Sequence, residues 1–278
     1  MLNKAIMICG AGHSGSTLLG FILGGLPHAF YMGEGAKLRY LRDERKPLRK
    51  RVCKLCGPDC SVWADFNYDS TLPVYEQVAA HTGAFVTIDS TKNPDWIAAR
   101  AEELRATGTV GYMIRLLRDG RAVMNSRFRK YPDRNPTEQI SAWMDQIRAT
   151  ETLYGNYSGP KLTLHYEQLA TDAEWTARRL CAFLELPFDP SLLDYGNKEH
   201  HPLGGNNGTQ TLVAKRQGRM RGDFVPGNAR SRDYYENHSG GIELDLRWQT
   251  EMNADRIALF EKLAGTLNER LRWEHVSK

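Results

Sequence analysis

A glycine-rich segment between an apolar run and a helical stretch is the feature that most constrains the fold of this chain. Residues 10–17 read GAGHSGST, the apolar residues 5–9 precede them, and residues 18–23 follow with helical spacing. The G-x-x-x-x-G-x-[ST] spacing is that of a phosphate-binding loop, in which backbone N–H groups and a helix N-terminus surround an anion. The alternative is a glycine-rich turn without a ligand. The segment predicts a strand, a loop and a helix in succession.

Three further apolar runs of strand length, residues 84–88, 110–117 and 162–166, alternate with helical stretches. This alternation is typical of a parallel sheet with crossover helices, so we expect an α/β fold with a P-loop-type parallel sheet flanked by helices. We expect one domain over residues 1–278. Two long insertions, residues 37–68 and 196–241, are expected to be loops. The later helices are expected over residues 134–154 (largely exposed), 172–186 and 255–272.

Composition excludes several classes of protein. Hydrophobic residues make up 41% of the 278, which is too many for a disordered chain, and the longest apolar runs are too short to span a membrane. The net charge of +4 is too small to predict nucleic-acid binding. The apolar run after Lys4 breaks at Gly10, unlike a signal peptide, and the five cysteines do not suggest a secreted disulfide scaffold. We therefore expect a cytoplasmic protein.

The loop lacks the lysine of nucleotide triphosphatases. Ser16 stands at that position. Because that lysine reaches the β- and γ-phosphates of ATP, its absence favours a nucleotide with a shorter phosphate chain.

A second candidate anion site follows the third apolar run. Arg118 stands at the expected carboxyl edge of the sheet, where open α/β folds bind ligands, and Ser126 lies two turns along the next helix. A guanidinium and a hydroxyl placed in this way could hold one more phosphate. A solvated basic helix is the alternative interpretation.

Together these segments resemble the PAPS-dependent sulfotransferases. Residues 10–17 are similar to the family's 5′-phosphosulfate loop, and residues 118–126 to its 3′-phosphate motif. Residues 89–92 (DSTK) and 166–169 (YEQL) match further motifs in order. The resemblance implies transfer of a sulfuryl group from PAPS to a hydroxyl or amine, leaving adenosine 3′,5′-bisphosphate. No metal is expected to be required, since the loop and side chains can supply the positive charge.

The resemblance also assigns roles to residues. Lys92 is expected to stabilise the transferring group, and Glu34, which follows Gly33 as in the protein-tyrosine sulfotransferases, to be the general base. Burial is expected to raise the pKa of Glu34. His13 replaces the arginine of the usual loop and is both a phosphate contact and a further catalytic candidate. The residues expected to bind the donor are Gly12, His13, Ser14, Gly15, Ser16, Thr17, Arg118, Ser126 and Tyr166.

Two clusters leave their roles open. Cys53, Cys56 and Cys60 lie close together in the sequence beside Trp63. They have three interpretations: reduced packing thiols, a disulfide, or a metal site without an evident fourth ligand. Several late basic residues are candidates to close over the 3′-phosphate: Lys215, Arg216, Arg219 and Arg221. In the same late region, Asn206 is a candidate contact for the donor or the acceptor.

The acceptor is expected to be a small bacterial metabolite, as in secondary metabolism, and the oligomeric state stays open. One alternative is a small P-loop kinase that uses ATP, with Asp89 as a magnesium ligand. The other alternative is a non-catalytic nucleotide-binding protein.

Overall fold

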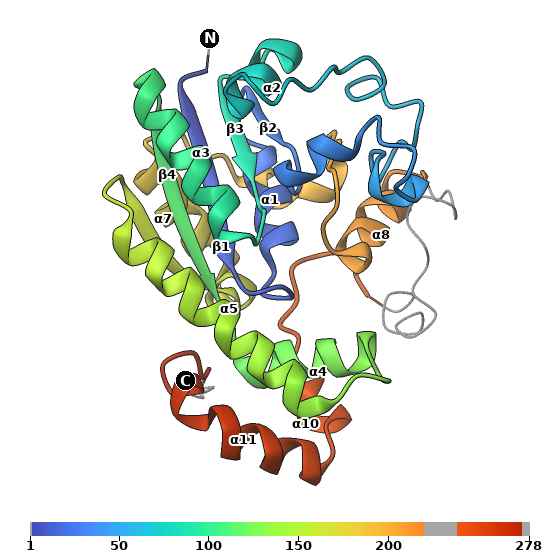
Figure 1. Ribbon diagram of the computed structural model, residues 1–278, viewed down its shortest axis with the longest axis vertical. Helices are drawn as coiled ribbons and strands as arrows, with labels where there is room; N and C mark the ends of the chain where they lie inside the picture. Colours follow the sequence, from blue (N-terminus) through green and yellow to red (C-terminus); the bar gives the residue numbers. More distant parts are fainter. Residues whose placement is uncertain (1, 220–237, 274–278) are drawn as a thin grey trace.

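The computed structural model describes residues 2–219 and 238–273 (Figure 1). A five-stranded sheet with the strand order β2-β3-β1-β4-β5 forms its centre, and all neighbouring strands are parallel. This confirms the α/β fold with a parallel sheet. The strands are β1 (Lys4–Gly10), β2 (Ala29–Tyr31), β3 (Val86–Asp89), β4 (Val110–Leu117) and β5 (Lys161–His165).

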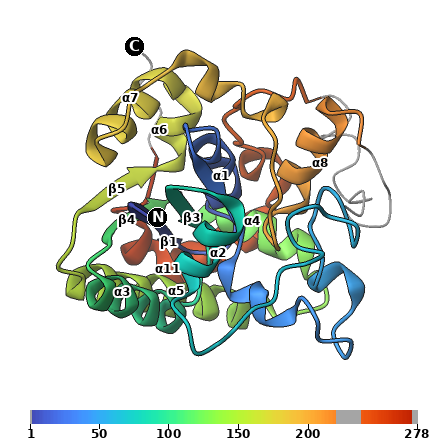
Figure 2. The same ribbon diagram turned by 90° about the horizontal axis from the view of Figure 1, so that it is seen from above.

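The central strand β1 explains why the first apolar run is continuous. It pairs with β3 on one side and with β4 on the other, and its residues from Ala5 onward are buried. A strand that helices cover on both faces needs apolar residues at successive positions rather than at alternate ones. Figure 2 shows α1 (Ser16–Gly24) and α7 (Ala173–Leu184) on one face of the sheet, with α3 (Pro94–Thr107) and α5 (Pro136–Asn156) on the other.

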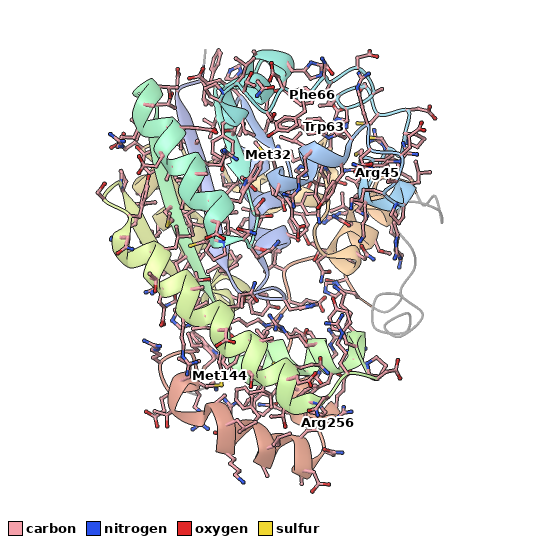
Figure 3. The ribbon with its side chains drawn as sticks, in the orientation of Figure 1. Met32, Arg45, Trp63, Phe66, Met144 and Arg256 are labelled. Carbon is pink, nitrogen blue, oxygen red and sulfur yellow. The ribbon has the colours of Figure 1, made fainter. Side chains whose placement is uncertain are left out.

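Helix α5 is more buried than the sequence predicts. Its residues Ile140, Trp143 and Ile147 are buried, because α5 packs on α4 (Gly120–Lys130) and on α11 (Ala254–Asn268). Figure 3 shows Met144 between α5 and α11, within this second apolar cluster. The expectation of a largely exposed helix is wrong, since the face that α11 covers cannot be recognised without knowing that the C-terminal helix returns there.

The two insertions differ from each other. Residues 37–68 are mostly irregular, with short 3₁₀ helices, and are anchored by Trp63 and Phe66, whose ring centroids lie 5.3 Å apart (Figure 3). In the second insertion, helix α8 (Asn207–Arg216) corrects the expectation of loops throughout. The Asn206 side chain caps this helix by accepting a hydrogen bond from the N–H of Thr209.

Several elements complete the described fold. Strand β2 was not predicted, and neither was α2 (Val74–Thr82). Two short helices, α6 (Tyr166–Thr171) and α10 (Trp248–Glu251), lead into α7 and α11. None of the helices in the described ranges is long and apolar enough to cross a membrane.

Candidate active site

A cleft lies beside the glycine-rich loop, at the carboxyl ends of strands β1, β3 and β4. Ligands of open parallel sheets bind at this edge. Residues from both predicted anion sites line the cleft: His13, Gly15, Ser16, Thr17, Lys92, Arg118, Ser126 and Tyr166. The structure therefore brings together segments that lie more than 100 residues apart in the sequence.

The loop adopts a conformation that requires glycine at Gly15. This residue has a φ of +89° and directly precedes α1. A Cβ at this position would lie 2.6 Å from Cδ2 of Tyr166. The close approach places the loop against the Tyr166 ring and the N-terminus of α1 in the wall of the cleft, where its partial positive charge favours an anion.

Replacing Gly15 by alanine is expected to weaken both the fold and anion binding. The left-handed backbone costs a residue with a Cβ about 1–2 kcal/mol, and the collision with Tyr166 forces the loop to shift. Thermal denaturation and titration with adenosine 3′,5′-bisphosphate measure the two effects. Gly108→Ala is the matched control, since Gly108 has a φ of +73° with open space around it and lies outside the cleft. Equal bisphosphate binding by both variants would contradict the importance of this close contact.

Two residues of the predicted loop do not face this cleft. Ser14 is buried, and Gly12 lines a neighbouring cavity beside Arg127 and Lys130. The N–H of Gly12 donates to Oε1 of Gln146 at 3.2 Å, so it already has a partner. Of the loop, the structure places residues 13 and 15–17 in the cleft wall.

His13 lies in the cleft wall with an unusually low pKa. Burial is the largest cause and four cations add to it, so that the pKa falls to about 3; the cations belong to Lys130, Arg127, Arg118 and Lys92. The backbone carbonyl of His13 accepts a hydrogen bond from Nη1 of Arg118 at 2.9 Å. At neutral pH the imidazole is neutral, so it does not replace the positive charge of the arginine usual in this loop. Such a low pKa also disfavours His13 as a general base.

Lys92 and Glu34, predicted separately, form an ion pair. The Nζ of Lys92 lies 3.1 Å from Oε1 of Glu34, and the Nζ of Lys37 lies 3.7 Å from Oε2. Lys92 lines the cleft, whereas Glu34 is not among the lining residues and lies beside Lys92. Burial raises the pKa of Glu34, but the two lysines together lower it by more than burial raises it. The pKa therefore falls below its usual value. The expectation of a raised pKa is therefore wrong.

The segment that carries Lys92 is held by Asp89, which is fully buried at the end of β3. Both carboxylate oxygens accept hydrogen bonds, from the N–H of Gly35, the N–H and hydroxyl of Thr91, the hydroxyl of Tyr75 and Nε1 of Trp96. These contacts fix the turn that leads to Lys92. They also disfavour Asp89 as a magnesium ligand, since a metal ion would have to displace these donors.

Arg118 is buried in the wall of the cleft, next to the carbonyl of His13. Its guanidinium lies over the ring of Tyr166, 4.2 Å from the centroid, and Nη2 lies 3.2 Å from Oδ2 of Asp245. Arg247 also contacts Asp245, with Nη2 at 2.8 Å from the same oxygen. Ser126 is half-buried in the same wall. The second predicted anion site thus contains two guanidinium groups around one carboxylate.

The segment that supplies Asp245 and Arg247 was missed in the sequence. Neither residue belongs to a motif, and only the return of the chain toward the sheet places them in the cleft. Among the late basic residues, Lys215, Arg216 and Arg219 are exposed and do not line the cleft, while Arg221 lies outside the described residues. Asn206 does line it, and its N–H donates to Oγ1 of Thr17 at 2.9 Å.

Comparison with known proteins identifies the family. The profile of a sulfotransferase family matches residues 5–190. The fold is similar to a sulfotransferase domain from the curacin biosynthetic pathway, with 19% identity and a TM-score of 0.59 over 98% of this chain and 100% of that one. No curated protein matches the sequence.

Two further solved structures share the fold. A sulfotransferase domain from the Synechococcus PCC 7002 olefin synthase is 20% identical, with a TM-score of 0.53 over 95% of each chain. Mouse sulfotransferase SULT7A1, solved in complex with PAP, is 11% identical, with a TM-score of 0.50 over 97% of this chain and 89% of the mouse chain. Because the family profile covers well over half of the sequence, this chain belongs to the sulfotransferase family.

Proposed function

We propose that the chain transfers a sulfuryl group from PAPS to a hydroxyl or amine of a small-molecule acceptor. The observation that carries the proposal is the meeting, in one cleft, of the phosphate-binding loop, Lys92, and the pair Arg118 and Ser126. A loop without the triphosphatase lysine, together with a separate guanidinium site, suits a nucleotide with phosphates on two different carbons. The mouse structure with PAP supports this donor class.

The loop and the residues around Arg118 have separate roles in holding the donor. The loop and the N-terminus of α1 would bind the 5′-phosphosulfate, since N–H groups at a helix start favour anions. Arg118 and Ser126 would bind the 3′-phosphate. The Asp245 carboxylate forms an ion pair with the Arg118 guanidinium. A phosphate that binds Arg118 therefore has to displace this carboxylate or share the guanidinium with it.

In the transfer step, the acceptor oxygen or nitrogen forms a bond to sulfur while the bond from sulfur to the 5′-phosphate oxygen breaks. The acceptor proton goes to the Glu34 carboxylate, which its lowered pKa keeps ionised at neutral pH. Lys92 neutralises charge on the sulfuryl group and the leaving phosphate. Because Lys92 lines the cleft and its Nζ also donates to Glu34, one side chain would link the leaving group to the base.

The similar structures and the cysteines guide the choice of acceptor and compartment. Two of the similar structures are domains of biosynthetic enzymes, which supports an acceptor of secondary metabolism. The five cysteines all lie within the described residues, and none of them forms a disulfide. We place the reaction in the cytoplasm, where thiols stay reduced.

Binding of the desulfated donor tests the proposal. Adenosine 3′,5′-bisphosphate at 100 times its Kd is expected to stabilise the protein by about 2.7 kcal/mol in thermal denaturation. ATP with magnesium and AMP are expected to stabilise it less. Stabilisation by ATP with magnesium, without stabilisation by the bisphosphate, would favour a kinase instead.

A pair of variants at the second anion site makes this test specific. Arg118→Ala is expected to lose at least about tenfold in bisphosphate affinity, the lower end of what a hydrogen bond to a charged group contributes. Asp245→Asn is expected to bind the bisphosphate more tightly than the natural chain, because it removes the carboxylate that competes for Arg118 and Arg247. Weaker binding by Asp245→Asn would show that the carboxylate positions the guanidinium groups rather than competing with the phosphate.

A further inference from the structure

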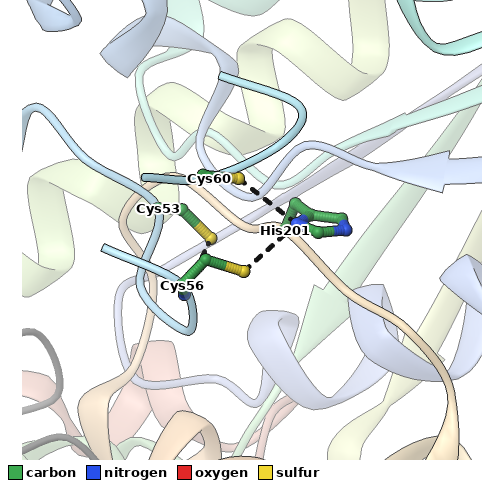
Figure 4. A group of neighbouring side chains, drawn as sticks. All are labelled: Cys53, Cys56, Cys60 and His201. Atoms are coloured by element: carbon green, nitrogen blue, oxygen red, sulfur yellow. Dashed lines mark hydrogen bonds between the residues drawn. The ribbon is translucent and has the colours of Figure 1, made fainter. Parts of the chain in front are cut away.

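Four metal-ligating side chains converge outside the cleft, on the two insertions. Cys53, Cys56 and Cys60 come from the first insertion and His201 from the second, and their ligand atoms all lie within 4.8 Å of one another (Figure 4). The Nδ1 atom of His201 lies 3.4 Å from Sγ of Cys56 and 3.3 Å from Sγ of Cys60. The sequence offers the three thiols without a fourth ligand; the fold supplies it from 141 residues away.

The separations suit a tetrahedral zinc site. Zinc bonds of about 2.3 Å to sulfur and about 2.0 Å to nitrogen, at tetrahedral angles, place sulfur and nitrogen about 3.5 Å apart. The observed distances from Nδ1 to the two sulfurs lie close to this value. Three thiols and one imidazole also form a closed ligand set that is typical of structural zinc sites.

The backbone around the thiols directs the sulfurs toward one point. Gly57 follows Cys56 with a φ of +82°, and its N–H donates to the carbonyl of Cys53 at 3.1 Å. The N–H of Cys56 also points at Sγ of Cys53, at 3.4 Å. This tight turn brings the first two sulfurs together and gives one of them a backbone donor that would stabilise a thiolate.

Contacts beyond the four side chains orient the histidine. Its Nε2 lies 3.1 Å from Oε1 of Glu199, which leaves Nδ1 facing the sulfurs. The backbone carbonyl of His201 accepts a hydrogen bond from Nε1 of Trp63 at 2.6 Å. A carboxylate on the far nitrogen is the usual arrangement for a zinc-bound histidine, because it fixes the tautomer and the ring orientation.

We propose that Cys53, Cys56, Cys60 and His201 bind a structural zinc ion. The three thiols lose their protons on binding, and the neutral imidazole supplies the fourth electron pair, so no oxidant or reductant is needed. None of the four residues lines the cleft, so the ion has no place in the transfer step. This inference does not depend on the identity of the sulfuryl donor.

The position of the site indicates what the ion does for the enzyme. Two residues after His201, the carbonyl of Leu203 accepts a hydrogen bond from the N–H of Glu34 at 2.6 Å. A Cβ on Gly204 would lie 2.9 Å from Oε2 of Glu34, and the N–H of Asn206 contacts Thr17. By tying the first insertion to the second, the ion fixes the segment that packs against the candidate base and the phosphate-binding loop.

Metal analysis of the full chain, purified from zinc-containing medium, tests the proposal. We expect about one zinc per chain, and at least a tenfold loss of zinc in Cys60→Ser. Cys181→Ser is the matched control, since Cys181 is a buried thiol on α7, away from the cluster, and this variant is expected to keep the zinc of the natural chain. Equal zinc in Cys60→Ser and the natural chain would overturn the proposal.

Two measurements on the natural chain decide the matter even if Cys60→Ser does not fold. After removal of zinc by a chelator, addition of Co²⁺ is expected to produce the absorption bands of a tetrahedral thiolate centre, and the apo chain is expected to unfold at a lower temperature. A purified chain without zinc that gives no such bands overturns the proposal. A mass lower by two protons, which marks a disulfide among the three cysteines, also overturns it.

Discussion

Replacing Lys92 by alanine is expected to lower the turnover of PAPS by about 100- to 1000-fold, the effect of removing one preorganised donor from a transition-state site. Lys92 is a cation in the wall of the cleft, placed by a fully buried turn at Asp89 and held against Glu34 at 3.1 Å. Conversion of PAPS to the bisphosphate, with a panel of small alcohols, phenols and amines as acceptors, measures the effect. Binding of the bisphosphate is expected to change much less, since that product lacks the sulfuryl group.

Lys37→Ala is the matched control for this variant. Lys37 also forms an ion pair with Glu34, at 3.7 Å, but it does not line the cleft. If Lys92 acts only by holding Glu34, the two variants should lose activity to similar extents. A much larger loss of turnover in Lys92→Ala than in Lys37→Ala is the result that supports direct action on the transferring group.

The parts of the fold that could be predicted are those encoded in contiguous residues. The first strand, the loop and the first helix follow from a buried apolar run, a glycine spacing and a helical period within residues 5–23. Lys92 and Arg118 could be placed because each lies within three residues of the end of a strand, and parallel strands bring their carboxyl ends to one edge. The local sequence pattern is enough to predict a side chain's position wherever the direction of its strand in the sheet determines that position.

The parts that could not be predicted depend on contacts between distant segments. The face of α5 around Trp143 is buried only because Phe260 of α11 packs against it, with ring centroids 5.5 Å apart. His201 lies next to another histidine in an insertion without a regular period, and only the fold brings it to the cysteines. Arg247 reaches the cleft in the same way.

The pKa of Glu34 illustrates the same limit in electrostatics. Glycine neighbours and burial predict a raised pKa for the carboxyl group, and burial does act in that direction. The opposing effect comes from Lys92, 58 residues away in the sequence, and from Lys37. Which effect is larger depends on distances that a sequence does not contain.

Replacing Glu34 by glutamine is expected to lower turnover by about 100- to 10,000-fold, the range for loss of a general base. Because the pKa of Glu34 lies below its usual value, turnover by the natural chain should have no acid limb near neutral pH, and should fall only when the pH drops below the usual pKa of a glutamate. Turnover by the Glu34→Gln variant should stay low across the same pH range. Rates of PAPS turnover at a series of pH values measure both profiles.

Stability provides an independent readout of the same carboxylate. A pKa lowered in the folded state stabilises the fold above the unfolded pKa, and this contribution disappears as the pH falls through the folded pKa. Glu34→Gln should therefore be less stable than the natural chain at neutral pH, with a smaller difference in acid, in chemical denaturation. Glu151→Gln is the matched control: its side chain is 23% exposed, as that of Glu34 is, and pairs with Arg270 away from the cleft. Turnover by Glu34→Gln equal to that of Glu151→Gln would remove Glu34 from the mechanism and leave it as a partner that positions Lys92.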